Sequence, residues 1–288
     1  MELQILKQIE NWAGSAVKNG IPLGGDSAAQ TRKVILESGK IYFLKYSRQN
    51  ATFSQEANGL EELRKAEIMR VPEIFLCEDN FLLLEFIESH SERPSSGFFS
   101  DFGRQFALLH RKKGETFGFY EDNFIGDSKQ LNICSLPESK NWASFYFNKR
   151  LLFQYRLAEK NGFDTPELRR LMKGMEERIE TILEGSEELP SLLHGDLWSG
   201  NFLMDRSGDP CLIDPAVYYG HREADLAMTK LFGGFDKNFY HSYQESFPLP
   251  PGYLHRENIY KLYHVLNHLN LFGRSYYSQT ISLMQSYL

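Results

Sequence analysis

The sequence has few cysteines and no long apolar run. Three cysteines stand in 288 residues, and Cys77, Cys134 and Cys211 lack the close spacing of metal ligands. Such a sparse, odd set predicts a reducing compartment, and we expect the cytoplasm. No apolar segment approaches the ~20 residues of a membrane helix. The first four residues lack the basic and apolar regions of a signal peptide, so we expect no membrane partner.

The sequence also lacks an excess of basic residues. It holds 32 Lys and Arg against 38 Asp and Glu, a net charge of −6, whereas binding to a nucleic-acid backbone needs a basic face. We therefore expect no nucleic-acid partner. With 42% hydrophobic and 14% aromatic residues, the composition is that of a well-filled globular protein. Its length suits two lobes around separate cores, and we expect a monomer.

The most informative segment lies between residues 194 and 215. It contains His194-Gly195-Asp196-Leu197-Trp198-Ser199-Gly200-Asn201 and then Ile213-Asp214-Pro215. Kinase catalytic loops space an acid, an amide and a second acid in this way. Phosphoryl transfer uses one carboxylate, here Asp196, to receive the proton of the acceptor hydroxyl, and further oxygens to hold Mg²⁺ on the nucleotide phosphates. We assign those oxygens to Asn201 and Asp214; the alternative is an ordinary loop without a metal.

The residues between the two proposed metal ligands favour the same interpretation. Apolar runs at 201–205 and 210–214 flank the turn-like sequence Arg206-Ser207-Gly208-Asp209. A hairpin there would fold Asp214 back beside Asn201, so that both could reach one ion. Two protein ligands suffice, because Mg²⁺ keeps water and phosphate oxygens in its coordination shell.

Two departures from protein kinases indicate a different acceptor. Gly195 stands where a protein kinase has the arginine of H-R-D, and Asp214-Pro215-Ala216 replaces D-F-G. Moreover, ten residues separate Asp214 from Asp225, which opens an apolar helix. That interval has no room for an activation loop or a peptide-docking platform. We therefore expect the acceptor to be a small molecule or one modified side chain.

The first 88 residues have the pattern of a nucleotide-covering N-lobe. We predict helices at 2–18 and 53–66 and strands at 31–37, 41–45, 71–77 and 81–87. Lys45 ends one strand, and Glu56 lies on the inner face of the second helix, so the two should form the ion pair that holds the α- and β-phosphates. Glu61 and Glu62 are the rival partners, and two exposed surface charges are the plainer alternative.

Two further segments of this lobe are candidates for nucleotide contacts. Gly24 and Gly25, with Ser27, could let backbone N–H groups approach phosphates, although a plain hairpin turn would also explain them. The backbone at Glu85, Phe86 and Ile87 would form the hinge that binds adenine. The region after the hinge is rich in Ser, Gly, Pro and charge, and we place the lobe boundary there, before residue 89.

Residues 89–288 should form a larger, helical lobe that carries the acceptor site. We predict helices at 102–111, 141–160, 166–184 and 256–272. In the last of these, His264, Asn267 and His268 share one face. We assign His264 and His268 to the acceptor, as hydrogen-bonding groups for a polyhydroxyl chain; histidines packed among aromatic side chains are the equal alternative. The whole pattern predicts an α+β, two-lobed, protein-kinase-like fold with a small, mostly antiparallel β N-lobe.

Several stretches together resemble the fructosamine/ketosamine-3-kinase family, in the aminoglycoside-phosphotransferase-like branch of the kinase fold. They are the loop 194–201, Asp214-Pro215-Ala216, Tyr218-Tyr219-Gly220-His221-Arg222-Glu223, Leu231-Phe232-Gly233-Gly234-Phe235, and Leu262-Tyr263-His264 with Asn267-His268. The resemblance extends over nearly the whole chain. One departure lies in the glycine loop, which has no cysteine, so redox control through that loop is not supported.

The resemblance implies a reaction and a set of roles. ATP would phosphorylate the 3-hydroxyl of a ketose attached through nitrogen to a lysine, an amino acid or another amine, and the product would decompose in a deglycation repair. Asp196 would be the base, Asn201 and Asp214 the Mg²⁺ ligands, and Lys45 with Glu56 the phosphate clamp.

The remaining motif residues would act around that centre. Trp198 would lie against a sugar face, or instead wedge the loop onto the larger lobe. Asp225 would accept hydrogen bonds from the backbone of the catalytic loop. One of His221, Arg222 and Glu223 should touch the acceptor.

Other interpretations stay open at this point. A related small-molecule kinase could act on aminoglycosides, choline or a thiosugar, although residues 258–288 contain no Asp or Glu for a polycation. An inactive nucleotide-binding scaffold would be expected to lose one of Lys45, Asp196, Asn201 or Asp214, and none is lost. A helical interaction protein would leave the whole set unexplained. The sugar and the amine carrier are not fixed by the sequence.

Overall fold

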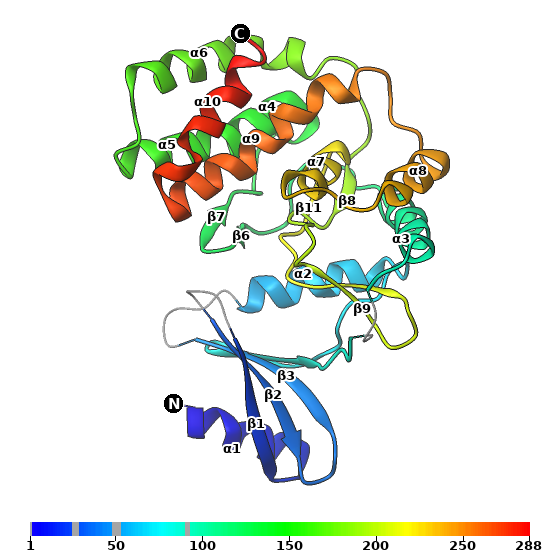
Figure 1. Ribbon diagram of the computed structural model, residues 1–288. Coiled ribbons are helices and arrows are strands. Elements are labelled where there is room, and N and C mark those ends of the chain that lie inside the picture. Colours follow the sequence, from blue (N-terminus) through cyan, green and yellow to red (C-terminus); the bar gives the residue numbers. More distant parts are fainter. Residues whose placement is uncertain (1, 25–28, 48–52, 90–92) are drawn as a thin grey trace.

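A computed structural model describes residues 2–24, 29–47, 53–89 and 93–288. A small lobe built around a sheet lies at one end of the molecule, and a larger lobe of helices lies at the other (Figure 1). The small lobe contains a five-stranded antiparallel sheet in the order β1-β2-β3-β5-β4. The arrangement is the predicted α+β, protein-kinase-like one.

The small lobe has the expected elements except at its start, where the first helix is shorter than predicted and strand β1 was not predicted. Its helices and strands are α1 (Glu2–Ala13), β1 (Val17–Gly24), β2 (Gln30–Leu36), β3 (Ile41–Tyr46), α2 (Phe53–Lys65), β4 (Ile74–Glu78) and β5 (Phe81–Glu85). The prediction of one helix over 2–18 is wrong. The helix ends at Ala13 because Gly14 adopts a φ of +63°, and Val17 already pairs with Leu36 in the sheet.

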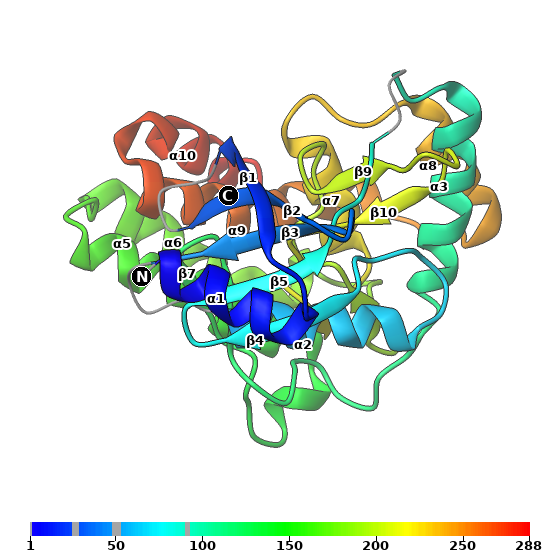
Figure 2. The same ribbon diagram turned by 90° about the horizontal axis from the view of Figure 1, so that it is seen from below.

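The two helices of this lobe cover opposite faces of the sheet (Figure 2). Ile5 and Ile9 of α1 join a buried cluster with Val34, Leu44 and Phe81 on one face. Side chains of α2 pack against Leu82 and Leu84 on the other face. Since side chains alternate along a strand, β5 supplies one residue to each cluster in turn. Because both faces of the sheet are covered, β3 and α2 are held in fixed positions relative to each other. These two elements carry Lys45 and Glu56.

The larger lobe is mostly helical. Its main helices are α3 (Ser96–Leu109), α4 (Trp142–Tyr146), α5 (Phe153–Lys160), α6 (Pro166–Ile182), α7 (Glu223–Leu231), α8 (Lys237–Ser246), α9 (Tyr253–Phe272) and α10 (Tyr277–Gln285). The predicted helix at 141–160 is present, but its middle, Phe147–Leu152, is π-helical. The helix expected from residue 102 begins earlier, because the Ser95 side chain accepts from the backbone N–H of Phe98 and caps it. Helices α8 and α10 were not predicted from the sequence.

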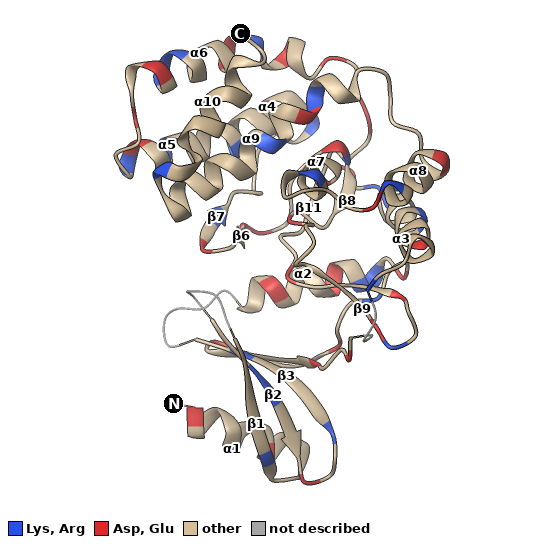
Figure 3. Ribbon diagram, in the orientation of Figure 1, with Lys and Arg blue, Asp and Glu red and all other residues tan. Residues whose placement is uncertain are grey.

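Short strands in this lobe frame the catalytic segment. They pair as β6 (Asn123–Ile125) with β7 (Ser128–Gln130), β8 (Ser191–Leu193) with β11 (Tyr218–Gly220), and β9 (Phe202–Met204) with β10 (Pro210–Leu212). No helix in the described part of the chain is long and apolar enough to cross a membrane. Charged residues of both signs are interspersed over the two lobes (Figure 3).

Three adjacent residues after β11 are buried, which corrects one expectation. Arg222 donates to the Glu188 carboxylate at 2.7 and 2.8 Å, and Glu223 accepts from Arg256 at 2.6 and 2.8 Å. The His221 ring stacks on Tyr260 with 6.1 Å between centroids. Because none of the three is more than 4% exposed, the prediction that one of them touches the acceptor is wrong; they hold helices together instead.

Acid should destabilise the protein through His221. The ring is 1% exposed, and burial lowers its pKa from 6.5 to about 3. As the pH falls below 6.5, His221 is protonated in the unfolded chain but stays neutral in the folded protein. The free energy of unfolding should therefore fall until the pH reaches about 3. This single group contributes a slope of about 1.4 kcal/mol per pH unit, which His221→Gln should remove in urea titrations across that range.

The matched control for this measurement is His241→Gln, on the exposed surface of α8. That side chain is 72% exposed, so the comparison separates the effect of burial at His221 from the loss of a histidine as such. A wild-type slope in the His221→Gln variant would show that His221 does not stay uncharged in the folded protein.

Candidate active site

The β9–β10 hairpin brings the two predicted metal ligands together. Leu212 pairs with Phe202, and the backbone N–H of Ile213 donates to the carbonyl of Asn201 at 3.1 Å. The Asn201 side-chain amide then lies 3.5 Å from the carbonyl of Asp214. The turn is closed by Asp205, whose carboxylate accepts from the backbone of Ser207 and of Asp209. Local turn chemistry therefore places Asp214 beside Asn201, as the sequence predicted.

A buried carboxylate at the start of α7 holds the catalytic loop. Asp225 accepts from the backbone N–H of His194 at 2.7 Å and of Gly195 at 2.8 Å, as predicted. Burial by itself would raise the pKa of Asp225, but the hydrogen bond from His110 and its charge bring that pKa below the ordinary value. Asp225 is therefore a fixed anion whose two oxygens set the path of the loop.

His194 adds a second constraint on the loop. Its Nε2 donates to the carbonyl of Ile213 at 2.9 Å, and its Nδ1 accepts from the backbone N–H of Asp196 at 3.2 Å. Burial lowers the pKa of His194, so the ring is neutral and can fill both roles at once. The ring thereby links the loop to the strand that precedes Asp214.

Gly195 is needed because the backbone is crowded there. Its φ is +85°, and a Cβ at this position would lie 1.9 Å from the carbonyl oxygen of Ala216. Any L-residue would be strained by the φ and would also strike that carbonyl. The glycine that replaces the arginine of H-R-D thus allows the segment after Asp214 to lie directly against the catalytic loop.

The Asp196 side chain lies at the centre of the assembled site. The Asn201 amide donates to the carbonyl of Asp196 at 2.8 Å and to its carboxylate at 3.2 Å. Burial raises the pKa of Asp196 well above its ordinary value, and the charges of Asp214 and Asp225 raise it further. A more basic carboxylate is better suited to receive a proton from a hydroxyl.

Lys45 connects this centre to the small lobe. Its ammonium donates to both oxygens of Glu56 at 2.8 and 3.0 Å and to Asp214 at 2.7 Å. Burial lowers the pKa of Lys45, but the two carboxylates outweigh burial and raise that pKa above its ordinary value. The rival partners have other contacts, since Glu61 pairs with Arg64 and Glu62 with Lys65. The preference for Glu56 is therefore confirmed.

The nucleotide side of the cleft is described in part. Gly24 ends β1 with a φ of +108°, while Gly25 and Ser27 lie outside the described residues. At the hinge, the Glu85 carboxylate accepts from Arg70 at 2.6 Å, and the Ile87 side chain is buried. Because these two side chains already have contacts within the protein, an adenine at the hinge would have to form its hydrogen bonds with backbone groups.

On the acceptor side, the structure separates the two predicted histidines. The ring of Trp198 is 37% exposed and contacts Phe232 edge-on at 5.8 Å. His268 reaches the same Phe232 ring at 5.2 Å. His264, in contrast, is 3% exposed, and its Nδ1 has no hydrogen-bond partner among the described residues. His264 packs inside the lobe, and burial lowers its pKa to about 3; its assignment to the acceptor stays a prediction.

The sequence analysis missed a buried amide cluster that holds the segment after Asp214. From the β6–β7 hairpin, Asn123 donates to the carbonyl of Val217 at 2.7 Å and Gln130 donates to the carbonyl of Ala216 at 2.9 Å. The Gln130 side-chain oxygen accepts from Tyr263 at 2.9 Å. Nothing in the sequence of this short hairpin indicated that Asn123 and Gln130 bind backbone carbonyls about ninety residues later in the chain. The cluster fixes a segment that in protein kinases begins the activation loop.

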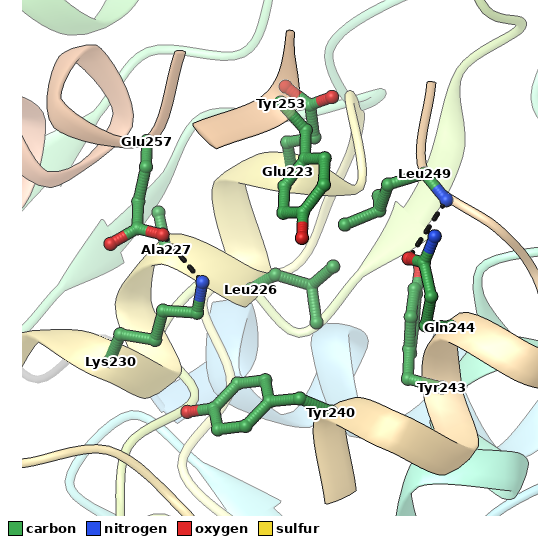
Figure 4. Close-up of a pocket in the computed structure, with 10 residues that line it drawn as sticks. All are labelled: Glu223, Leu226, Ala227, Lys230, Tyr240, Tyr243, Gln244, Leu249, Tyr253 and Glu257. Carbon is green, nitrogen blue, oxygen red and sulfur yellow. Dashed lines mark hydrogen bonds and ion pairs between the residues drawn. The ribbon is translucent and has the colours of Figure 1, made fainter. Parts of the chain in front are cut away.

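A separate pocket between α7, α8 and α9 contains Glu223 but none of the residues predicted to hold the nucleotide, the metal or the transferred proton (Figure 4). Its polar side chains are already paired: Lys230 donates to Glu257 at 2.5 Å, and the Gln244 side chain accepts from the backbone of Leu249 at 3.1 Å. The pocket therefore offers no set of converging groups for chemistry, in contrast to the centre around Asp196.

The fold and the site together define a phosphotransferase of the protein-kinase fold. A crystal structure of the aminoglycoside phosphotransferase APH(2'')-Ib with ADP shares this fold, with a TM-score of 0.66 and 14% identity over 99% of this chain and 98% of that chain. A crystal structure described as a fructosamine-3-kinase of Thermobifida fusca is much more similar. It has a TM-score of 0.88 and 30% identity over 98% of each chain.

The family follows from the sequence matches. The fructosamine kinase family model matches residues 1–288, and the chain belongs to this family. A protein of Enterococcus faecium named a probable ketoamine kinase is 39% identical over 93% of this chain and 94% of its own length. A chloroplastic protein-ribulosamine 3-kinase of Arabidopsis thaliana is 37% identical over 86% of this chain and 76% of its own. The protein is thus an ATP-dependent phosphotransferase with a hydroxyl group as acceptor.

Replacing Gly195 by alanine should disrupt the active site, and Gly39→Ala is its matched control. The two glycines have φ values of +85° and +84°, but a Cβ at Gly39 would meet nothing within 4 Å. Gly39→Ala should therefore cost only the backbone strain, about 1 kcal/mol of the free energy of unfolding. Gly195→Ala should cost at least about 2 kcal/mol more, because of the contact with the Ala216 carbonyl. Equal costs in urea unfolding would show that this contact does not constrain the loop.

Proposed function

We propose that the protein phosphorylates the 3-hydroxyl of ketosamines, which are ketoses joined through nitrogen to an amine, at the expense of ATP. The observation that carries this proposal is membership of the fructosamine kinase family over the whole chain. Its relatives are named ketoamine kinase and protein-ribulosamine 3-kinase. Phosphorylation would make the adduct decompose and free the amine, so the physiological role would be the repair of glycated amines.

In the proposed reaction, Asp196 receives the proton of the 3-hydroxyl. The oxygen of that hydroxyl forms a bond to the γ-phosphorus in line with the bond that breaks, and ADP leaves with the electron pair. Two features of the site support this role for Asp196. Asn201 holds its carboxylate by a 3.2 Å hydrogen bond, and burial raises its pKa.

Lys45 would bind the α- and β-phosphates while Glu56 orients it. Its ammonium already lies between the carboxylates of Glu56 and Asp214, so it is positioned where the nucleotide phosphates must approach the proposed metal ligands. Backbone groups at Gly24, Gly25 and Ser27 would cover the phosphates. The backbone at Glu85, Phe86 and Ile87 would bind the adenine, which assigns residues 1–88 to the nucleotide-covering lobe.

Mg²⁺ would be held by Asp214 and Asn201. The donor set fits this ion: Asp214 offers a carboxylate that is 45% exposed, and Asn201 turns its NH₂ group toward Asp196, which leaves its carbonyl oxygen for a metal. The described residues contain no group of three or more His, Cys, Asp or Glu for a metal, and such a group is not needed. When bound, Mg²⁺ supplies positive charge against the β- and γ-phosphate oxygens.

The lack of an activation segment supports a small acceptor. After Asp214 the chain enters β11 and then α7 directly, and Asn123 and Gln130 hold the residues between. We infer that the active arrangement needs no phosphorylation of the protein. We also infer a cytoplasmic location, which three free cysteines support, and a monomer.

The proposed function is tested with a substrate panel and mass detection of the product. Ribulosamine, erythrulosamine and fructosamine adducts of lysine should be phosphorylated, and free ribose and kanamycin should not. Asp196→Asn keeps the shape of the side chain but cannot accept the proton, so single-turnover rates should fall by ~10²–10⁴-fold while ATP still binds. If ribose or kanamycin reacts faster than every glycated lysine, the protein is a small-molecule kinase with another substrate. A rate for Asp196→Asn within about tenfold of wild type would exclude Asp196 as the base.

Removing the carboxylate of Asp214 should act through the metal. Asp214→Ala should raise the Mg²⁺ concentration needed for half-maximal rate or abolish activity, and Asn201→Ala should have a milder effect because a neutral carbonyl is the weaker ligand. Asp209→Ala is the control, since it removes an exposed acid from the turn of the same hairpin. An Mg²⁺ titration of Asp214→Ala that overlays wild type would disprove the metal assignment.

A further inference from the structure

A row of exposed and half-buried aromatic rings extends from the catalytic loop to the residues just after α9. It begins with Trp198 on Phe232 at 5.8 Å and continues with Phe232 on His268 at 5.2 Å. His268 then contacts Phe272 at 5.4 Å and Tyr276 at 5.1 Å. We call these five residues the aromatic platform. They come from four separate segments, so the platform is a product of tertiary structure.

Large parts of the platform are open to solvent. Phe232 is 42% exposed and Phe272 is 62% exposed. A single exposed aromatic ring is ordinary, but contiguous apolar side chains at a surface usually mark a binding site. The end of α9 lies on the side of the larger lobe that is nearer the small lobe (Figure 1). The platform therefore belongs to the same side of the molecule as the catalytic loop.

The platform is also neutral. Burial lowers the pKa of His268, which keeps that ring uncharged near neutral pH, and its Nδ1 donates to the carbonyl of His264 at 2.6 Å. Residues 258–288, which supply three of the five rings, contain no Asp or Glu. A cationic group on this surface would thus find aromatic faces but no carboxylate from residues 258–288.

The chemistry of a ketosamine places its amine close to this surface. This step rests on the proposed function. The reacting hydroxyl is on carbon 3 and the nitrogen is on carbon 1, so the amine carrier leaves the sugar only two carbons from the reacting centre. With the hydroxyl at Asp196, the carrier must lie against residues that adjoin the catalytic loop, and the platform begins at Trp198, two positions along the chain.

We propose that Phe232, Phe272 and Tyr276 form the subsite for the amine carrier, and that the subsite selects carriers with an apolar or aromatic group next to the nitrogen. Such a group covers the exposed rings and gains both apolar burial and ring–ring contact. A carrier with a second positive charge gains less, because it must lose water without meeting a carboxylate from residues 258–288. The sugar itself lies nearer Asp196, with Trp198 and His268 between the two parts.

The test uses ketosamines that share one sugar, ribulose, and differ in the amine: methylamine, benzylamine and 1,4-diaminobutane. In the wild type, kcat/KM should be about tenfold higher for the benzylamine adduct than for the methylamine adduct, and the diaminobutane adduct should not exceed the methylamine adduct. In Phe272→Ala and in Tyr276→Ala the ratio of benzylamine to methylamine should fall toward one. Leu254→Ala is the matched control, because Leu254 is a 66% exposed side chain near the other end of α9, and its ratio should stay at the wild-type value.

The outcomes separate the subsite from the proposed function. If all three adducts are phosphorylated at equal kcat/KM, or if the ratio survives in both Phe272→Ala and Tyr276→Ala, the carrier subsite is disproved while the ketosamine kinase activity stands. If the diaminobutane adduct is preferred, the subsite selects charge and the proposal is also wrong. If no adduct is phosphorylated, the proposed function itself fails. Because Phe272 is exposed, its replacement should not unfold the protein, and an unchanged thermal midpoint verifies this.

Discussion

The carboxylate of Asp225 is the constraint on which the active site depends. Its two oxygens accept from the backbone of His194 and Gly195, and it is buried, so water does not compete for these bonds. The loop is thereby fixed at two successive peptide groups just before Asp196. His194 then ties the loop to the carbonyl of Ile213. Asp196 and the segment that carries Asp214 are positioned by one short chain of hydrogen bonds.

The same rigidity explains how the protein works without an activation loop. In this chain the residues after Asp214 are held by side chains of the β6–β7 hairpin and lie against Gly195. Protein kinases leave the equivalent segment free to be ordered by phosphorylation. Here its position is part of the folded core, so the site is assembled whenever the protein is folded. Lys45, between Glu56 and Asp214, extends this assembled site into the small lobe.

The acceptor side has a different character from the phosphate side. Around Asp196 the groups are charged and paired, whereas the surface beyond Trp198 is aromatic and neutral. A polar reacting centre beside an apolar surface suits a substrate with two unlike parts, a sugar and an amine carrier. The division agrees with the proposed reaction, in which the sugar would be phosphorylated and the amine then released.

Much of the site could be predicted because its residues lie close together in the sequence. The interval from Asp196 to Asn201 and on to Asp214 determines a hairpin that closes within fourteen residues of Asn201, and β3 and α2 are neighbours in the chain, so Lys45 could be matched with Glu56. The prediction of a helix over 2–18 was wrong at its C-terminal end, because Gly14 has a positive φ and the chain enters the sheet soon after it.

Tertiary structure decided what no spacing could reveal. His264 and His268 share a helical face in sequence, yet one is buried beside Tyr263 and the other contacts Phe232, because the packing of α9 against its neighbours sets which part of that face is covered. Likewise, Asn123 and Gln130 find their partners some ninety residues away. The sequence by itself determined the chemistry of phosphoryl transfer, since neighbouring residues carry it. Burial and the aromatic platform arise from contacts between distant segments, and only the folded chain brings those segments together.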